Sequence, residues 1–230
     1  MKLNLSGHQF SVYGTVTFEF ISFCQSECQS FHFLRLVKPK VIKLLVQLLI
    51  HPVLMIIGLI VIGGEAIISY KSLALKKELK KLIHLVLHAI AIALGIIGIY
   101  CAFKYHNESG IANLYSLHSW LGIVVISLYC IQWLYGFLTF FFPGGSAFLR
   151  QESLPWHVLF GLIVYVLAVG TATLGFLEKL TFLENSGLAK YGAEALLVNF
   201  TAVITVLFGA FVVLTVISQG STSEDDYTAI

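Results

Sequence analysis

The chain has 230 residues, of which 58% are hydrophobic and only 11% are charged, and its formal net charge is +2. A soluble domain has about 45–50% apolar and about 25% charged residues, so a water-soluble fold of this size could not bury so many apolar side chains. The composition therefore predicts a protein embedded in a lipid bilayer. The small net charge gives no reason to expect nucleic acid as a partner.

The N-terminal segment, residues 1–43, shows no clear membrane-spanning helix. Its apolar part is short and contains Glu19, and it lacks the charged start and the cleavage site of a signal peptide. Cys24, Cys28 and His32 form only a weak metal-binding pattern, because structural zinc sites usually have four ligands. We therefore predict an atypical N-terminal segment that precedes a membrane core.

Five long apolar segments make up this core, predicted at 44–217. They lie near 44–70, 84–103, 118–142, 157–177 and 195–217. Each is long enough for the roughly 20 residues that cross a bilayer core as a helix, and a helix satisfies its backbone groups without help from lipid. We expect an all-α membrane protein, an antiparallel bundle with five strong spanning segments. The acidic tail at 218–230 is predicted to be disordered.

The charge of the linkers orients this bundle. The linker at 71–81 holds five lysines and one glutamate, so the positive-inside rule places it in the cytoplasm. The linkers at 104–117 and 178–194 lack such an excess of positive charge and fit the opposite side. The linker at 143–156 is then cytoplasmic, because successive helices alternate in direction.

Four histidines stand near the starts of four successive apolar segments: His51, His84, His118 and His157. Because these helices alternate in direction, the first and third histidines lie toward the non-cytoplasmic side, and the second and fourth toward the cytoplasm. A rise of about 1.5 Å per residue and a bilayer core of about 30 Å put the two layers roughly 20 Å apart. Two imidazoles that face each other across a bundle are suitable axial ligands of a haem iron.

Roles without haem are also compatible with these histidines. A histidine in a membrane helix can serve as a hydrogen-bonding group between helices. A proton path would favour mixed acidic residues and histidines, but only Glu65 lies near a helix interior. His88 is one turn beyond His84 and shares its face, so it is a second candidate ligand or a hydrogen-bonding neighbour; we favour His84.

Several motifs resemble the cytochrome b-561 family of transmembrane ascorbate-dependent reductases, most of all its plant members. They include HPVLMIIG from His51, KKLIH ending at His84, SLHSWLG around His118 and PWH ending at His157. The resemblance covers about 48–217. It implies six helices whose central four-helix core holds two haem b groups, in the pairs His51–His118 and His84–His157. Residues 1–49 depart from the family, because they do not look like its first spanning helix.

The resemblance also implies electron transfer from cytoplasmic ascorbate, through the two haems, to monodehydroascorbate or a ferric chelate on the other side. Lys77, Lys81 and Arg150 match family positions near the cytoplasmic donor site, and His106 matches one near the opposite site. Lys81 and His106 are the candidate catalytic residues. A basic cluster suits ascorbate, which is an anion at pH 7, and an imidazole exchanges protons near neutral pH.

The expected class is therefore an oxidoreductase, an ascorbate-dependent transmembrane ferrireductase. The resemblance fits a vacuolar or other endomembrane, or the plasma membrane. The expected partners of the protein are ascorbate, the electron acceptor and the lipid bilayer. Whether it also forms a homodimer stays open. Two alternatives stay open as well: a haem-free, histidine-based, proton-coupled transporter, and an inactive isoform that lacks the first helix.

Overall fold

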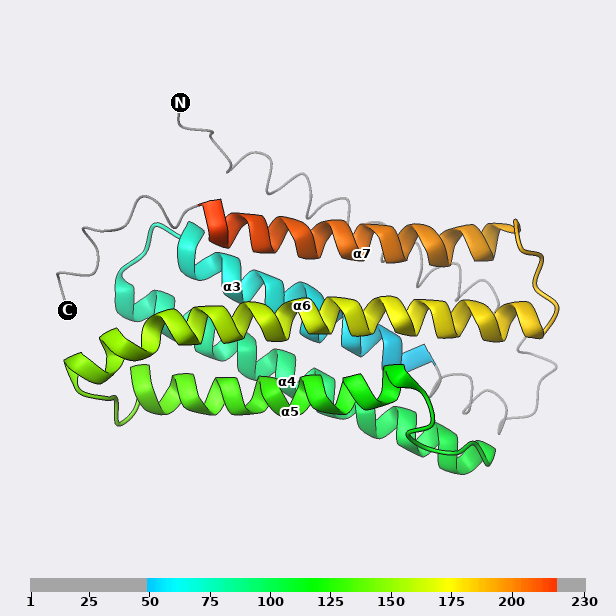
Figure 1. Cartoon of the computed structure of the whole chain (residues 1–230), viewed down its shortest axis with the longest axis horizontal. Helices are drawn as coiled ribbons and strands as arrows, with labels where there is room; N and C mark the ends of the chain where they lie inside the picture. Colours follow the sequence, from blue (N-terminus) through cyan, green and yellow to red (C-terminus); the bar gives the residue numbers. More distant parts are fainter. Residues whose placement is uncertain (1–48, 219–230) are drawn as a thin grey trace.

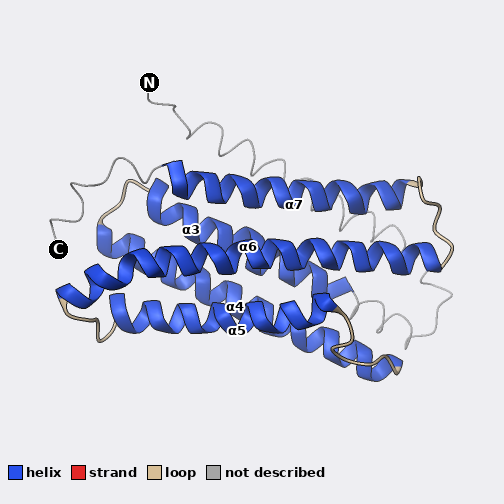
Figure 2. Ribbon diagram, viewed as in Figure 1, coloured by secondary structure: helices blue, strands red, loops and turns tan. Residues whose placement is uncertain are grey.

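The computed structural model of the chain describes residues 49–218, and within them every regular element is a helix (Figure 2). Five helices are long and apolar enough to cross a membrane: Leu49–Tyr70, Lys77–Ser109, Leu117–Phe140, Ala147–Asn185 and Ala193–Ser218. The prediction of an all-α bundle with five spanning segments is confirmed. The predictions for residues 1–43, including the Cys24, Cys28 and His32 motif, and for the tail after Ser218 concern residues outside the described range.

The first span changes its winding part-way along. It is helical from Leu49, passes through a π-helix, η2 (Ile56–Ile62), and continues as α3 (Gly63–Ser72). A π-helix has a wider turn than an α-helix, and such segments are frequent at functional sites. Within it, Gly58 allows close approach to the next span, because a Cβ there would lie 2.9 Å from the Cβ of Leu94.

Four spans form a ring, and the fifth packs on its outside (Figure 1). The other helices are α4 (Lys77–Ser109), α5 (Leu117–Phe140), α6 (Ala147–Asn185) and α7 (Ala193–Ser218). The first span contacts α4, α4 contacts α5, α5 contacts α6, and α6 contacts η2 to close the ring, whereas α7 packs against α3 and α6. The four spans that carry the candidate histidines therefore surround one interior.

A buried tyrosine joins the ring to the outer helix. Tyr165 on α6 is almost completely buried and packs in one cluster with Ile60 of η2 and Phe208 of α7. Its hydroxyl group donates a hydrogen bond to the carbonyl oxygen of Ile60, at 3.1 Å. A buried tyrosine hydroxyl needs such a partner, so this contact fixes α6 against the first span at the middle of the bundle.

The helices α4 and α6 are longer than their apolar segments predict. They begin at Lys77 and Ala147, and their 33 and 39 residues extend about 50 and 58 Å, well beyond a bilayer core of about 30 Å. Hydropathy marks only the part in lipid, whereas lysine and glutamate favour helix in water as well. The predicted linkers at 71–81 and 143–156 are correspondingly shorter, and α6 continues through Pro155.

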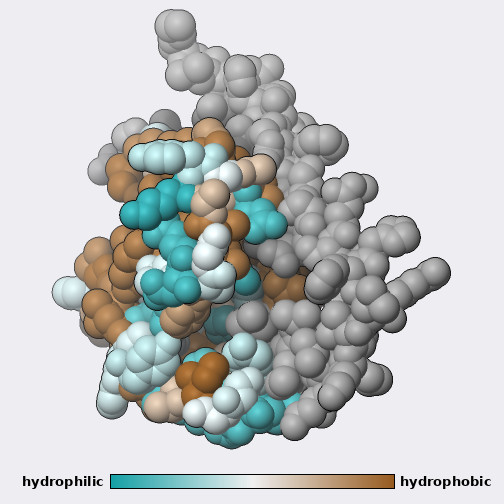
Figure 3. All heavy atoms as spheres, turned by 90° about the vertical axis from the view of Figure 1, so that its right-hand side faces the viewer, coloured by the Kyte–Doolittle hydropathy of each residue, from teal (hydrophilic) through white to brown (hydrophobic). Residues whose placement is uncertain are grey.

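The projecting helix ends place polar residues outside the bilayer. Figure 3 shows the end of the bundle at which α4 and α6 finish, where hydrophilic side chains gather, while hydrophobic side chains lie along the flank. Exposed large apolar side chains on the flanks, such as Ile97, Leu138 and Leu207, are what a surface in contact with lipid requires.

Candidate functional site

The structure brings the four candidate histidines together in two pairs. The ring centroids of His51 and His118 are 6.2 Å apart, and those of His84 and His157 are 6.4 Å apart. One pair joins the first span to α5, and the other joins α4 to α6. Each pair therefore crosses the interior of the four-helix ring, with the partners that alternating helix direction predicts.

A hydrogen bond on Nδ1 orients three of the four imidazoles in the same way. In each of them Nδ1–H donates to a main-chain carbonyl oxygen: His51 to Gly98 at 3.0 Å, His84 to Ala66 at 2.8 Å and His118 to Thr171 at 2.9 Å. A carbonyl oxygen can only accept, so the proton is held on Nδ1. Nε2 is then left with its lone pair, which is the form of imidazole that binds a metal ion.

The fourth imidazole has a different partner. The amide nitrogen of Gln132 on α5 lies 2.9 Å from Nδ1 of His157, and it donates a hydrogen bond to the carbonyl oxygen of His157 at 2.6 Å. This ring is therefore held by a side chain and not by the backbone.

The two pairs form two layers with a constant separation along the bundle. On each of three helices, fourteen residues separate a contact in one layer from a contact in the other: His84 and Gly98 on α4, His118 and Gln132 on α5, and His157 and Thr171 on α6. At about 1.5 Å per residue, the layers are about 21 Å apart, close to the expected 20 Å.

Two glycines provide room for the rings on α5 and α6. A Cβ on Gly136 would lie 2.8 Å from Cε1 of His157, and a Cβ on Gly175 would lie 2.8 Å from Cε1 of His118. Carbon atoms in contact prefer about 3.5–4.0 Å. Any side chain at either position would therefore displace the imidazole beside it.

His88 is a neighbour of the second pair. Its Nδ1 is 2.6 Å from the hydroxyl oxygen of Tyr129 on α5, and its ring centroid is 4.4 Å from that of His84. His84 is the ring that faces His157. The structure thus gives His84 the position opposite His157 and gives His88 a hydrogen-bonding role between α4 and α5.

The spacing within each pair suits one metal ion held between two imidazoles. A metal–nitrogen bond is about 2.0 Å long and Nε2 lies roughly 1.1 Å from its ring centroid, so two imidazoles that bind one metal ion from opposite sides would have centroids about 6.2 Å apart. The observed separations are 6.2 and 6.4 Å. Among residues 49–218 no cluster of three or more His, Cys, Asp or Glu forms a metal site. Two opposed imidazoles are the protein's share of a six-coordinate haem iron.

Comparison with known proteins identifies the family. The sequence model of eukaryotic cytochrome b561 matches residues 50–183, more than half of the chain. The chain belongs to the eukaryotic cytochrome b561 family. The resemblance read from its motifs is confirmed, and the matched range includes all four paired histidines. The five spanning helices within residues 49–218 make this family member an integral, multi-pass membrane protein.

Three curated relatives show how far the similarity extends. "Transmembrane ascorbate ferrireductase 1" of Arabidopsis thaliana is 69% identical over 166 residues, which cover 72% of this chain and 70% of the relative. "Probable ascorbate-specific transmembrane electron transporter 1" of Oryza sativa subsp. japonica is 65% identical over 176 residues, covering 76% and 75%. "Transmembrane ascorbate-dependent reductase CYB561" of Mus musculus is 40% identical over 174 residues, covering 75% and 69%.

The predicted donor-site residues of this cytochrome b561 lie at one end of the bundle, because α4 and α6 both begin there (Figure 1). Lys77 is exposed, and Lys81 is half-buried with its Nζ 3.4 Å from Oε1 of Glu78. Arg150 is half-buried, and its Nε is buried without a hydrogen-bond partner among the described residues. An unsatisfied buried guanidinium nitrogen is costly unless a ligand completes it.

The opposite end carries His106 in the last turn of α4. Its ring lies 6.0 Å from that of Tyr105, and its carbonyl oxygen accepts a hydrogen bond from the backbone N–H of Ile111 at 2.9 Å. His106 is thus placed on the side away from Lys77, Lys81 and Arg150. Lys77 and Lys81 lie in the first turns of α4 and His106 in its last turn, so nearly the full length of this helix separates them.

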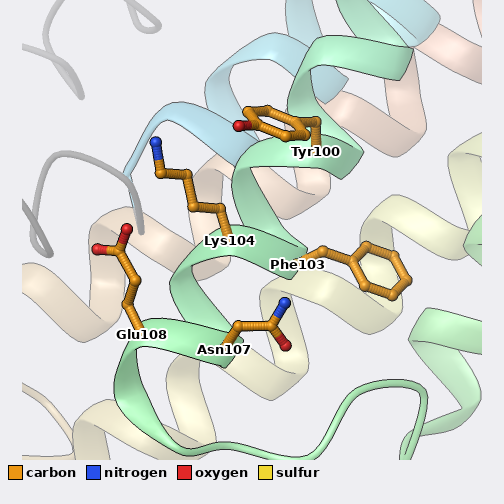
Figure 4. A pocket seen from close by; sticks show the side chains of 5 residues that line it. All are labelled: Tyr100, Phe103, Lys104, Asn107 and Glu108. Carbon is orange, nitrogen blue, oxygen red and sulfur yellow. The ribbon is translucent and has the colours of Figure 1, made fainter.

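An open pocket near this end lies on another face of α4 (Figure 4). It is lined by Tyr100, Phe103, Lys104, Asn107 and Glu108. His106 is not among the lining residues, so this pocket is distinct from the predicted acceptor-side position.

The sequence did not reveal the residues that support the paired histidines. Gln132 and Gly136 carry no motif of their own, and TATLGFLE, the family-like motif that contains Gly175, assigns it no role. The one signal that would have found them is spacing, since Gln132 follows His118 by the same fourteen residues that separate His157 from Thr171. That spacing acquires meaning only when the register of the two helices is known.

Proposed function

We propose that this cytochrome b561 transfers electrons across its membrane, from cytoplasmic ascorbate to an acceptor on the opposite side, as an ascorbate-dependent oxidoreductase. The observation that carries the proposal is the presence of two opposed imidazole pairs, with centroids 6.2 and 6.4 Å apart, in two layers of one membrane bundle. The relatives named for ascorbate-dependent reduction support ascorbate as the donor.

In this proposal, His51 and His118 hold one haem b and His84 and His157 hold the other, each imidazole binding iron through Nε2. A bound haem of this kind supplies a centre that changes its charge by one electron. The protein's part is orientation, because Nδ1–H bonds to carbonyl oxygens of α4, α6 and the first span aim three rings across the interior, while the side chain of Gln132 on α5 holds the ring of His157. Such bonds fix the ring direction and raise the basicity of the ligand.

The basic end of the bundle would bind the donor. Lys77, Lys81 and Arg150 concentrate positive charge where α4 and α6 begin, and ascorbate is an anion at neutral pH. The buried Nε of Arg150, unpaired within residues 49–218, supports a ligand with acceptor oxygen atoms at this end. Lys81 would orient the bound anion, with its ammonium group itself restrained by Glu78.

The opposite end would serve the acceptor, which we propose to be monodehydroascorbate or a ferric chelate. Reducing monodehydroascorbate to the ascorbate monoanion consumes one electron and one proton. His106 is an imidazole at that end of α4, and an imidazole can deliver a proton near neutral pH.

The ring-centroid distance within each histidine pair suits a metal ion held between the two rings. Together with family membership, this distance favours electron transfer over a haem-free proton-coupled transporter.

Haem quantitation and ascorbate-dependent reduction test the proposal. The purified protein should contain two haems per chain, and ascorbate should reduce them in a difference spectrum. In liposomes loaded with ascorbate, an external ferric chelate should be reduced at a rate that depends on the protein. His118→Ala should retain one haem, whereas His106→Gln should retain both. A colourless protein after expression with added haem would refute the function.

A further inference from the structure

The helices α5 and α6 support their two histidines through a nearly symmetrical set of contacts. His118 on α5 contacts α6 at Thr171 and at Gly175, and His157 on α6 contacts α5 at Gln132 and at Gly136. In both cases the two contact positions are four residues apart, which is about one helical turn. The ligand supports on the two antiparallel helices are thus related by an approximate two-fold arrangement.

This symmetry breaks at the partner of Nδ1. For His118 the partner is the main-chain carbonyl oxygen of Thr171, whose hydroxyl group bonds instead to the carbonyl oxygen of Leu167 at 2.8 Å. For His157 the partner is the side-chain amide of Gln132, which also bonds to the carbonyl oxygen of His157. The Nδ1 partner of His157 is therefore a side chain, whereas the Nδ1 partner of His118 belongs to the backbone.

The amide of Gln132 lies against α6, and the residue is half-buried. A Cβ on Gly161, one turn beyond His157 on α6, would lie 3.4 Å from its amide nitrogen. Gln132 therefore fills the space between the ring, the backbone oxygen of His157 and the next turn of α6. Among the Nδ1 contacts of the four paired histidines, it is also the one that a substitution can change without moving a main chain.

We propose that Gln132 is the positioning residue that sets the redox potential of the haem held by His84 and His157, and so distinguishes it from the other haem. The inference rests on the proposed function. Ligand orientation and hydrogen bonding around the iron help to set a haem potential. In the structure the amide nitrogen of Gln132 lies at Nδ1 and donates to the carbonyl oxygen of His157. Iron binding through Nε2 requires the proton on Nδ1, so the amide then turns over and presents its oxygen to that proton. A stronger acceptor there would increase electron donation from Nε2 to the ferric iron.

Two replacements of Gln132 by side chains of similar length test whether it sets this redox potential. In Gln132→Glu, a carboxylate accepts a charge-assisted bond from Nδ1–H, so we expect the ferric form to be favoured about tenfold, which lowers the midpoint of one haem by 59 mV for a one-electron couple. In Gln132→Met, the hydrogen bond is lost while the flexible side chain fills the space, so the same midpoint should rise. Spectroelectrochemical titration measures both midpoints, and the ferric EPR signal of that haem should change with them.

A control variant makes the result specific. Gln151→Glu adds the same charge at the exposed start of α6. It should leave both midpoints within error of wild type. If it shifts a midpoint as far as Gln132→Glu does, the inference is overturned.

The experiment distinguishes failure of this inference from failure of the proposed function on which it rests. If the wild-type protein lacks two haems, or His157→Ala retains both, the ligand assignment fails. If wild type has two haems and His157→Ala has one, yet Gln132→Glu and Gln132→Met keep both wild-type midpoints, only the role of Gln132 is refuted. Should one of these two variants not accumulate, the other still decides, because each has its own expected direction.

Discussion

Replacing Gly175 by alanine should weaken the haem site at His118 selectively. The new Cβ would lie 2.8 Å from Cε1 of His118, so the ring must move by about 0.7 Å or more to reach an ordinary carbon–carbon contact. The ring cannot move freely, because its Nδ1 is bonded to the carbonyl oxygen of Thr171 at 2.9 Å. Overpacking of this kind costs about 1–3 kcal/mol, which corresponds to roughly 5- to 150-fold weaker haem binding.

The matched control is Gly170→Ala on the same helix, where a Cβ would meet nothing within 4 Å. Alanine favours helix over glycine by about 1 kcal/mol, so a loss of haem in Gly175→Ala cannot come from a weaker helix. The assay is the haem-to-protein ratio after detergent purification, followed by the rate of haem transfer to an excess of apomyoglobin. If Gly175→Ala holds both haems as firmly as Gly170→Ala does, the proposed contact between ring and backbone is wrong.

Three more sets of variants probe the same geometry. His84→Ala and His157→Ala should each retain one haem, and the double variant should also retain one, because both residues serve the same site; a double variant without haem would contradict the pairing. His88→Ala should retain two haems, since its Nδ1 is engaged by Tyr129, and loss of one haem would make it a ligand. Arg150→Gln should raise KM for ascorbate about tenfold, roughly 1.4 kcal/mol, with a smaller effect on kcat; added salt should shrink the difference, and an unchanged KM would remove Arg150 from the donor site.

Much of the architecture was predictable because lipid imposes a local rule on sequence. Each span must be apolar over about 20 residues, so five spans were countable along the chain, and alternation of direction assigned each histidine to a side. The ends of α4 and α6 were not predictable in this way. Lys77 and Ala147 begin these helices in water, where helix formation does not depend on hydropathy.

The supporting contacts of the site required the tertiary structure. Ala66, Gly98 and Thr171 act through carbonyl oxygens, which every residue possesses, so no residue type marks them. The requirement for glycine at Gly136 and Gly175 arises from the rotation of α5 against α6, which brings a ring onto a backbone. Sequence by itself determined the membrane character, the spans, the family and the histidines, since these depend on local composition and spacing. Only the packed bundle decided which atoms hold each ring, because that depends on how neighbouring helices are rotated and shifted relative to one another.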